Sequence, residues 1–171
     1  METINRIINT IDKINEYVAR AVQWFVLILI LTLVYEVVMR YVFGNPTLWS
    51  FDVTYMSASI FLMLGMGYTL KEGGHVNIDI LVGNLSRRNQ AILNLVFFVI
   101  LFFPLWYAIL HSFTPNLIRA WETAERARVG TWRPPIYPFK TWLFLGMVLL
   151  LIQGISEFLK ELLIVLRGEN K

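Results

Sequence analysis

The 171-residue sequence contains no cysteine and few charged residues. Without cysteine, the chain has no disulfides, thiolate metal sites or thiol chemistry. Only 16% of its residues are charged and 57% are hydrophobic, whereas a soluble domain carries about 25% charged residues. The sequence also lacks zinc-ligand spacing, a glycine-rich phosphate loop and any nucleophile–base pattern. These absences argue against a soluble enzyme and favour a membrane protein without a metal or other cofactor.

Positive charge is in slight excess, but it does not form a basic stripe. The net charge is +3 and the pI is about 9.3, values that can indicate a nucleic-acid partner. Here the cations lie in short clusters between apolar runs, a pattern that indicates membrane orientation instead. The first apolar run begins near Val22, is too long for a signal peptide and precedes no small-residue cleavage site. We therefore expect no nucleic-acid partner and a first span that stays in the protein.

Residues 3–20 have the periodicity of an amphipathic helix. Its polar side is expected to carry Arg6, Asp12, Lys13, Glu16 and Arg20. Two placements remain open: the apolar stripe lies in lipid at the membrane surface, or it packs on another protein helix. The stripe consists of Ile4, Ile7, Ile8, Ile11, Ile14 and Val18.

Four apolar runs are long enough to cross a bilayer of about 30 Å. We predict spans at 22–43, 50–70, 91–110 and 141–166. The fold class is therefore an all-α membrane protein with four transmembrane helices and an N-terminal amphipathic helix, in a single membrane domain. Small residues in the second span permit close helix packing or are ordinary membrane-helix composition; they are Ser57, Ala58, Ser59, Gly65 and Gly67.

The segments between spans suggest an orientation. Residues 117–128 are predicted to form a short amphipathic helix within the polar stretch 111–139, and the proline-rich run 134–138 is predicted to be non-helical. With four spans, both termini and the 71–90 loop share one side. That side carries nine of the 15 lysine and arginine residues, which favours termini in the cytoplasm.

Charged residues inside or beside a span are costly in lipid, so each is expected to have a structural or functional role. Glu36 and Arg40 are four residues apart and predict an ion pair on one helix face. The alternative makes Glu36 a proton-coupling carboxylate, but a nearby cation keeps a carboxylate ionised. Asp52 lies in the first turn of the second span, where it either interacts with the helix N-terminus or pairs with Arg40.

Two further polar pairs are candidates for function. Gln153 and Glu157 are four residues apart and face either a partner helix or the cytoplasmic surface. His75 and His111 are the only histidines. They are expected on opposite sides of the membrane, which disfavours a bis-histidine haem site.

Three local motifs resemble those of a known family. The first is the run 40–46 followed by Trp49-Ser50 and Asp52, which includes Asn45 and Pro46; the second is Gly74-His75-Val76 with Asp79. The third is the run 135–140, ending in Lys140, with Leu150, Gln153, Gly154 and Glu157. Together they resemble the small, DctQ-type permease subunit of tripartite ATP-independent periplasmic (TRAP) transporters. One departure is Phe51-Asp52, where the family often has two glutamates after the Trp-Ser pair.

This resemblance implies a non-enzymatic subunit of the bacterial or archaeal inner membrane. Its partners would be membrane lipid, a large transport subunit and a periplasmic substrate-binding protein for an organic acid, with transport commonly driven by sodium. The motif residues would then be packing and interface elements. Arg126, Arg128 and Arg133 would present cations to the docking periplasmic protein, or lie in a merely solvated loop. Two alternatives are a self-sufficient ion-coupled transporter that acts as a homo-oligomer and a membrane redox protein.

Overall fold

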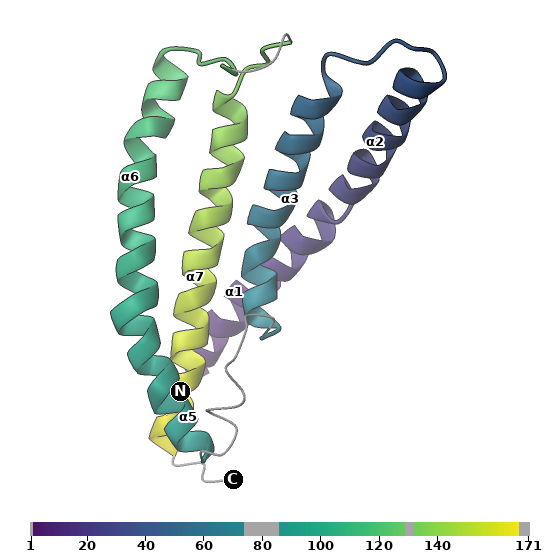
Figure 1. Cartoon of the computed structure of the whole chain (residues 1–171). Helices are drawn as coiled ribbons and strands as arrows, with labels where there is room; N and C mark the ends of the chain where they lie inside the picture. Colours follow the sequence, from purple (N-terminus) through teal and green to yellow (C-terminus); the bar gives the residue numbers. More distant parts are fainter. Residues whose placement is uncertain (1, 74–85, 129–131, 168–171) are drawn as a thin grey trace.

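The structure is a computed structural model that describes residues 2–73, 86–128 and 132–167. The described residues form helices, with no strand beyond one isolated bridge between Arg126 and Pro135. Four helical segments are long and apolar enough to cross a membrane, which confirms the predicted fold class. Figure 1 shows them running up and down, with the start of α1 and the end of α7 at the same end of the bundle. The four segments are Glu2–Tyr41, Ser50–Lys71, Arg87–Glu122 and Tyr137–Leu166.

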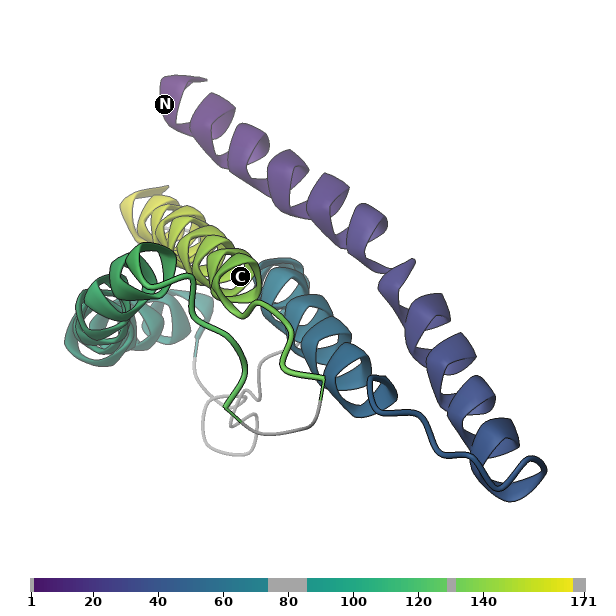
Figure 2. The ribbon, with the colours of Figure 1, turned by 90° about the horizontal axis from the view of Figure 1, so that it is seen from above.

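The first segment consists of two helices in line. α1 (Glu2–Val22) and α2 (Phe25–Tyr41) are separated only by Gln23 and Trp24, and Figure 2 shows them as one bent rod beside α3 (Ser50–Lys71). The rod has 40 residues, and at 1.5 Å per residue its length is about 60 Å. A membrane core is about 30 Å thick, so most of α1 extends beyond the span.

The third segment contains a π turn. It consists of α5 (Arg87–Phe97), the π-helical η1 (Phe98–Phe102) and α6 (Phe103–Glu122). The amide of Phe103 donates to the carbonyl of Phe98. Pro104 follows directly and has no amide hydrogen to continue the normal ladder. The wider turn thus lies where the proline interrupts regular α-helical bonding.

Helix boundaries differ from the sequence prediction at the loop after this segment. The helix predicted over 91–110 continues to Glu122, so the predicted separate helix at 117–128 is wrong. Ala120 in the added turns is fully buried, and this packing extends the helix past the last strongly apolar run. α7 (Tyr137–Arg167) begins before the predicted 141 and includes the end of the run 134–138, so the prediction that this whole run is non-helical is wrong. Pro138 is tolerated in the first turn of a helix, where amides lack helical partners.

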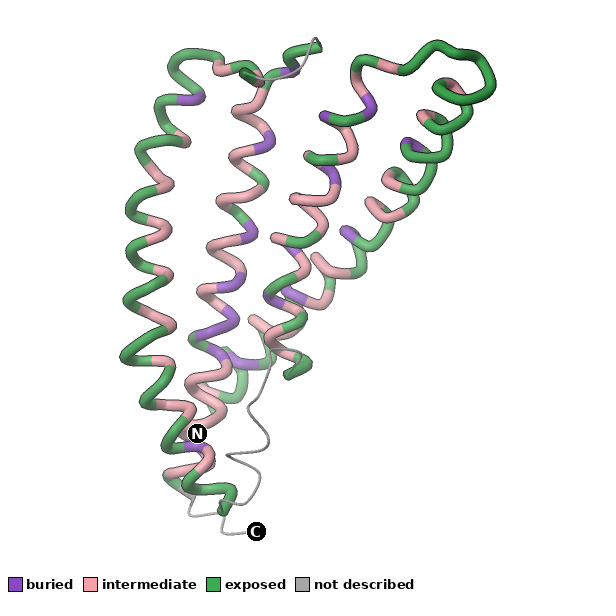
Figure 3. The backbone as a smooth tube through the Cα atoms, in the orientation of Figure 1, coloured by how far each residue is buried: buried purple, intermediate pink, exposed green. Residues whose placement is uncertain are grey.

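α7 is the central helix of the bundle. It packs on α1, α3, α5 and α6, and Figure 3 shows the buried positions recurring along it. Two glycines bring its neighbours close. A Cβ on Gly146 would lie 2.9 Å from backbone atoms of Met63 in α3, and one on Gly154 would lie 2.2 Å from the ring of Phe102 in η1. Small residues on α7 therefore set these contacts, as is usual between membrane helices.

The outward faces of the spans are apolar and open. Leu31 of α2 and Ile100 of η1 are each 69% exposed, and α2 diverges from α6 and α7 toward its turn with α3 (Figure 1). In a bilayer these faces contact lipid or the helices of another protein.

Candidate functional site

The turn between α2 and α3 is organised by Glu36. Its Oε1 accepts hydrogen bonds from Arg40 Nε at 3.0 Å and Nη2 at 2.6 Å, so the predicted ion pair is present. Its Oε2 accepts from the amide of Thr47 at 3.0 Å and from the Thr47 hydroxyl. One carboxylate therefore ties the last turns of α2 to the loop that enters α3.

The same turn is closed by backbone and ring contacts. Gly44 has φ +62°, a left-handed conformation that suits glycine at a helix C-terminus. The amide of Asn45 then donates to the carbonyl of Met39 at 2.9 Å. Trp49 stacks on Tyr35 of α2 with centroids 5.7 Å apart, while Pro46 is exposed. The turn is thus a fixed corner.

Asp52 does not join the Arg40 pair. It lies in the first turn of α3 and is buried, and among the described residues Arg40 forms its ion pair with Glu36 alone. This position in the first turn is the one favoured for an interaction with the helix N-terminus.

A second polar site lies where α6 passes into α7. Lys140 Nζ contacts Glu125 Oε2 at 2.5 Å. The hydrogen bond from Lys140 holds the pKa of Glu125 below its ordinary value of 4.5. Trp121 also donates to the hydroxyl of Thr141 at 3.0 Å and packs on Tyr137. Lys140 therefore fastens the loop to the start of α7.

The three arginines predicted for this loop differ in their contacts with Glu125. Arg126, Arg128 and Arg133 are all exposed, but only Arg128 approaches Glu125, at 3.5 Å. Arg119 of α6 lies near the same carboxylate and contributes to its low pKa. The sequence interpretation did not single out Arg119, because no local pattern places it beside Glu125.

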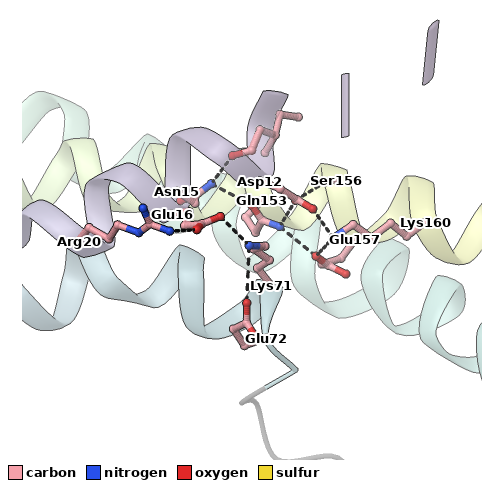
Figure 4. A network of polar contacts seen from close by, with 11 residues as sticks. Asp12, Asn15, Glu16, Arg20, Lys71, Glu72, Gln153, Ser156, Glu157 and Lys160 are labelled. Carbon is pink, nitrogen blue, oxygen red and sulfur yellow. Dashed lines mark hydrogen bonds and ion pairs between the residues drawn. The ribbon is translucent and has the colours of Figure 1, made fainter. Parts of the chain in front are cut away.

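A buried polar junction joins α1, α3 and α7 near the opposite end (Figure 4). Gln153 of α7 is fully buried and accepts a hydrogen bond from Asn15 Nδ2 at 2.8 Å. Its own amide group donates to Asp12 Oδ1 at 2.8 Å and to Glu157 Oε1 at 2.9 Å. Asn15 is also fully buried, and its Oδ1 occupies the space where Gly67 has no Cβ. Gln153 therefore faces a partner helix, and that partner is α1.

Charged side chains surround this junction. Lys160 contacts Asp12 at 2.8 Å and Glu157 at 2.7 Å, and Lys71 of α3 contacts Glu16 at 3.3 Å. The polar side predicted for this helix therefore faces neighbouring helices at Asp12 and Glu16. Both carboxylates bind cations of neighbouring helices, and α1 packs on protein helices while Ile7, Ile14 and Tyr17 remain exposed.

Asn15 carried a signal that the sequence interpretation missed. Ile8, Ile11, Val18 and Val22 flank it at intervals of three and four residues. A polar residue in such an apolar stripe indicates a specific polar contact at the interface, as it does in coiled coils.

The histidines and the second motif add little to these sites. His75 and Asp79 lie outside the described residues. His111 is exposed on α6, beside the ring of Tyr107. Within 2–73, 86–128 and 132–167, no group of three or more histidine or acidic residues is arranged to hold a metal ion.

Comparison with known proteins places these sites in a family. No curated protein matches the chain. A family model, described as the DctQ component of tripartite ATP-independent periplasmic transporters, matches residues 29–163. The match spans the α2–α3 corner, the Glu125–Lys140 contact and the α7 half of the buried junction. The chain therefore belongs to the DctQ family and is a small membrane subunit of a TRAP transporter.

Proposed function

We propose that this subunit braces the large transport subunit of a TRAP system that takes up an organic acid, commonly with sodium. The proposal rests on the contacts that the charged residues of the first span form. Glu36, the one acidic residue of α2, is bound by Arg40 and Thr47. A carboxylate held in this way fixes a corner and is poorly suited to bind and release an ion. The open apolar faces of the bundle suit contacts with another membrane protein.

The proposed orientation places the chain in the cytoplasmic membrane with both termini inside. The excess of lysine and arginine on the side of the termini supports it. The α2–α3 corner and the Glu125–Lys140 contact would then face the periplasm, where the substrate-binding protein approaches.

The test of the bracing role is co-purification. The chain is tagged, expressed with the large membrane subunit encoded beside it, and purified in mild detergent. We expect both proteins to elute together in equal amounts. Elution of this chain alone as a defined homo-oligomer would contradict the proposal and favour a self-sufficient transporter that uses Glu36.

The variant Arg40→Ala sharpens this test. It removes one of the two residues that bind Glu36 and loosens the corner, so we expect less large subunit to co-purify while the affinity for substrate stays unchanged. Arg6→Ala is the matched control, because Arg6 pairs with Glu2 at the same spacing on the exposed side of α1. A changed substrate affinity with intact assembly would show that the corner acts in transport instead.

A further inference from the structure

We propose that a polar pocket between α6, its following loop and α7 binds the carboxylate of an acidic side chain on the periplasmic substrate-binding protein. The inference rests on the proposed function, because it requires this end of the bundle to face the periplasm. The pocket has a volume of about 180 Å³ and is lined by Asn116, Arg119, Thr123, Glu125, Arg128 and Lys140.

The walls of the pocket are held in place by backbone hydrogen bonds. The amide of Ile136 donates to the carbonyl of Glu125, and the amide of Ala127 donates to that of Pro134, each at 2.9 Å. The amide of Glu125 donates to the carbonyl of Ala120 in α6, also at 2.9 Å. The loop residues of the pocket are therefore fixed to α6 on one side and to the entry of α7 on the other. A site that is preformed in this way loses less entropy when a ligand binds.

The charges of the pocket favour an anion. Three cationic side chains line it against one carboxylate. Glu125 is engaged mainly by Lys140, at 2.5 Å, whereas its contact with Arg128 is long, at 3.5 Å. Among the described residues, Arg119 has no ion-pair partner within 4 Å. The guanidinium groups of Arg119 and Arg128 therefore keep donors for an incoming carboxylate, which arginine can bind through two parallel hydrogen bonds.

The size and lining indicate a side chain of a protein partner as the source of that carboxylate. Pockets for drug-sized molecules have volumes of about 300–1,000 Å³, so this one suits a single acidic group better than a whole substrate. None of its six lining residues is aliphatic or aromatic. It therefore offers no wall for an acyl chain, which a site for an anionic lipid would need.

The experiment measures docking on the assembled membrane complex. This chain and the large subunit are reconstituted together in lipid nanodiscs and immobilised, and binding of the periplasmic component of the same transporter is followed by biolayer interferometry over a range of salt concentrations. We expect Arg119→Gln with Arg128→Gln to weaken binding by about tenfold or more and to flatten its salt dependence. The matched control is Arg126→Gln with Arg133→Gln, which removes the same charge from the same end outside the pocket and should weaken binding by less than about threefold.

A second pair of variants separates geometry from folding. Arg119→Lys with Arg128→Lys keeps the charge but removes the planar donor pairs, and should give an intermediate loss while the complex keeps its thermal stability. Equal losses in the Gln pair and in its control would overturn the proposal in favour of a general positive field. Unchanged docking with a raised transport KM would overturn it in favour of free substrate in the pocket. A wild-type chain that does not assemble with the large subunit would reject the bracing role itself and this inference with it, whereas assembly with unaltered docking rejects the pocket alone.

Discussion

Gln153 shows, at the scale of a single residue, what a polar side chain does inside this bundle. Its amide accepts from Asn15 and donates to Asp12 and Glu157 at the same time. An apolar side chain of similar size cannot form these hydrogen bonds. A buried polar group that is left without a partner costs more free energy than a hydrogen bond contributes to stability. The junction therefore links α1 to α7 through partners that must all be present.

Gln153→Leu should destabilise the protein. The substitution removes the hydrogen bonds of Gln153 to Asn15, Asp12 and Glu157, and we expect a loss of roughly 1–3 kcal/mol. Asp12 keeps its contacts with Ser156 and Lys160. Thermal unfolding in detergent, followed by loss of the monodisperse peak, measures it. The control is Asn5→Leu on the exposed side of α1, which should be nearly neutral. Equal stability of the two variants would mean that α1 is not held by the junction.

At the scale of elements, the packing of α7 on the π turn depends on one missing methyl group. Phe102 reaches the backbone of Gly154 only because that residue has no side chain. The π turn itself lies just before Pro104. The π turn before Pro104 thus places Phe102 against Gly154, and the rings of Phe98, Phe103 and Phe158 pack nearby.

Gly154→Ala should weaken this contact. The added Cβ would lie 2.2 Å from the Phe102 ring, and overpacking of this kind costs roughly 1–3 kcal/mol. Gly65→Ala in α3 is a close control, because nothing lies within 4 Å of its Cβ position. In the same thermal assay, Gly65→Ala should be neutral or slightly stabilising, because alanine has a higher helix propensity than glycine. Similar losses in both variants would argue against the Phe102 contact.

The link between the α6–α7 loop and α7 should depend on pH. The pKa of Glu125 is lower in the folded protein than its ordinary value of 4.5, first because of the hydrogen bond from Lys140. A depressed folded pKa stabilises the protein above the unfolded pKa, and this contribution is lost as the pH falls through the folded value. We expect Glu125→Gln to lower the midpoint of thermal unfolding at neutral pH, and the difference from wild type to disappear in acid.

Lys140→Met tests the cause of that pH dependence. It removes the partner of Glu125, so the double variant with Glu125→Gln should be no less stable than either single variant at neutral pH. Additive losses would show that the two side chains act independently.

At the scale of the whole molecule, the span formed by α2 differs from α1 in how it packs. α1 is fixed to α3 and α7 by polar contacts, whereas α2 packs on α3 and diverges from α6 and α7 (Figure 1). Thr32 is the only buried residue of α2. Much of the surface of α2 is therefore available for a partner, and α2 carries the corner formed by Glu36 and Arg40.

We therefore predict that α2 meets the large subunit. A photo-crosslinking amino acid at Leu31, on the open side of α2, should capture the large subunit in membranes. The same group at Ile100 in η1, which is equally exposed at 69%, should capture little of it. The reverse result would move the interface to the side of α5 and α6.

The sequence by itself determined the four spans, the amphipathic first helix and the family, because bilayer thickness demands long apolar runs and the motifs are local. It also predicted the Glu36–Arg40 pair, whose members are one helical turn apart. Only the tertiary structure decided that Asp12, Asn15 and Gln153 meet, that α6 continues to Glu122, and that Arg119 and Lys140 share a pocket. Helical periodicity shows which face of a helix a residue occupies. It does not show which distant helix covers that face, because this depends on how all the helices pack together.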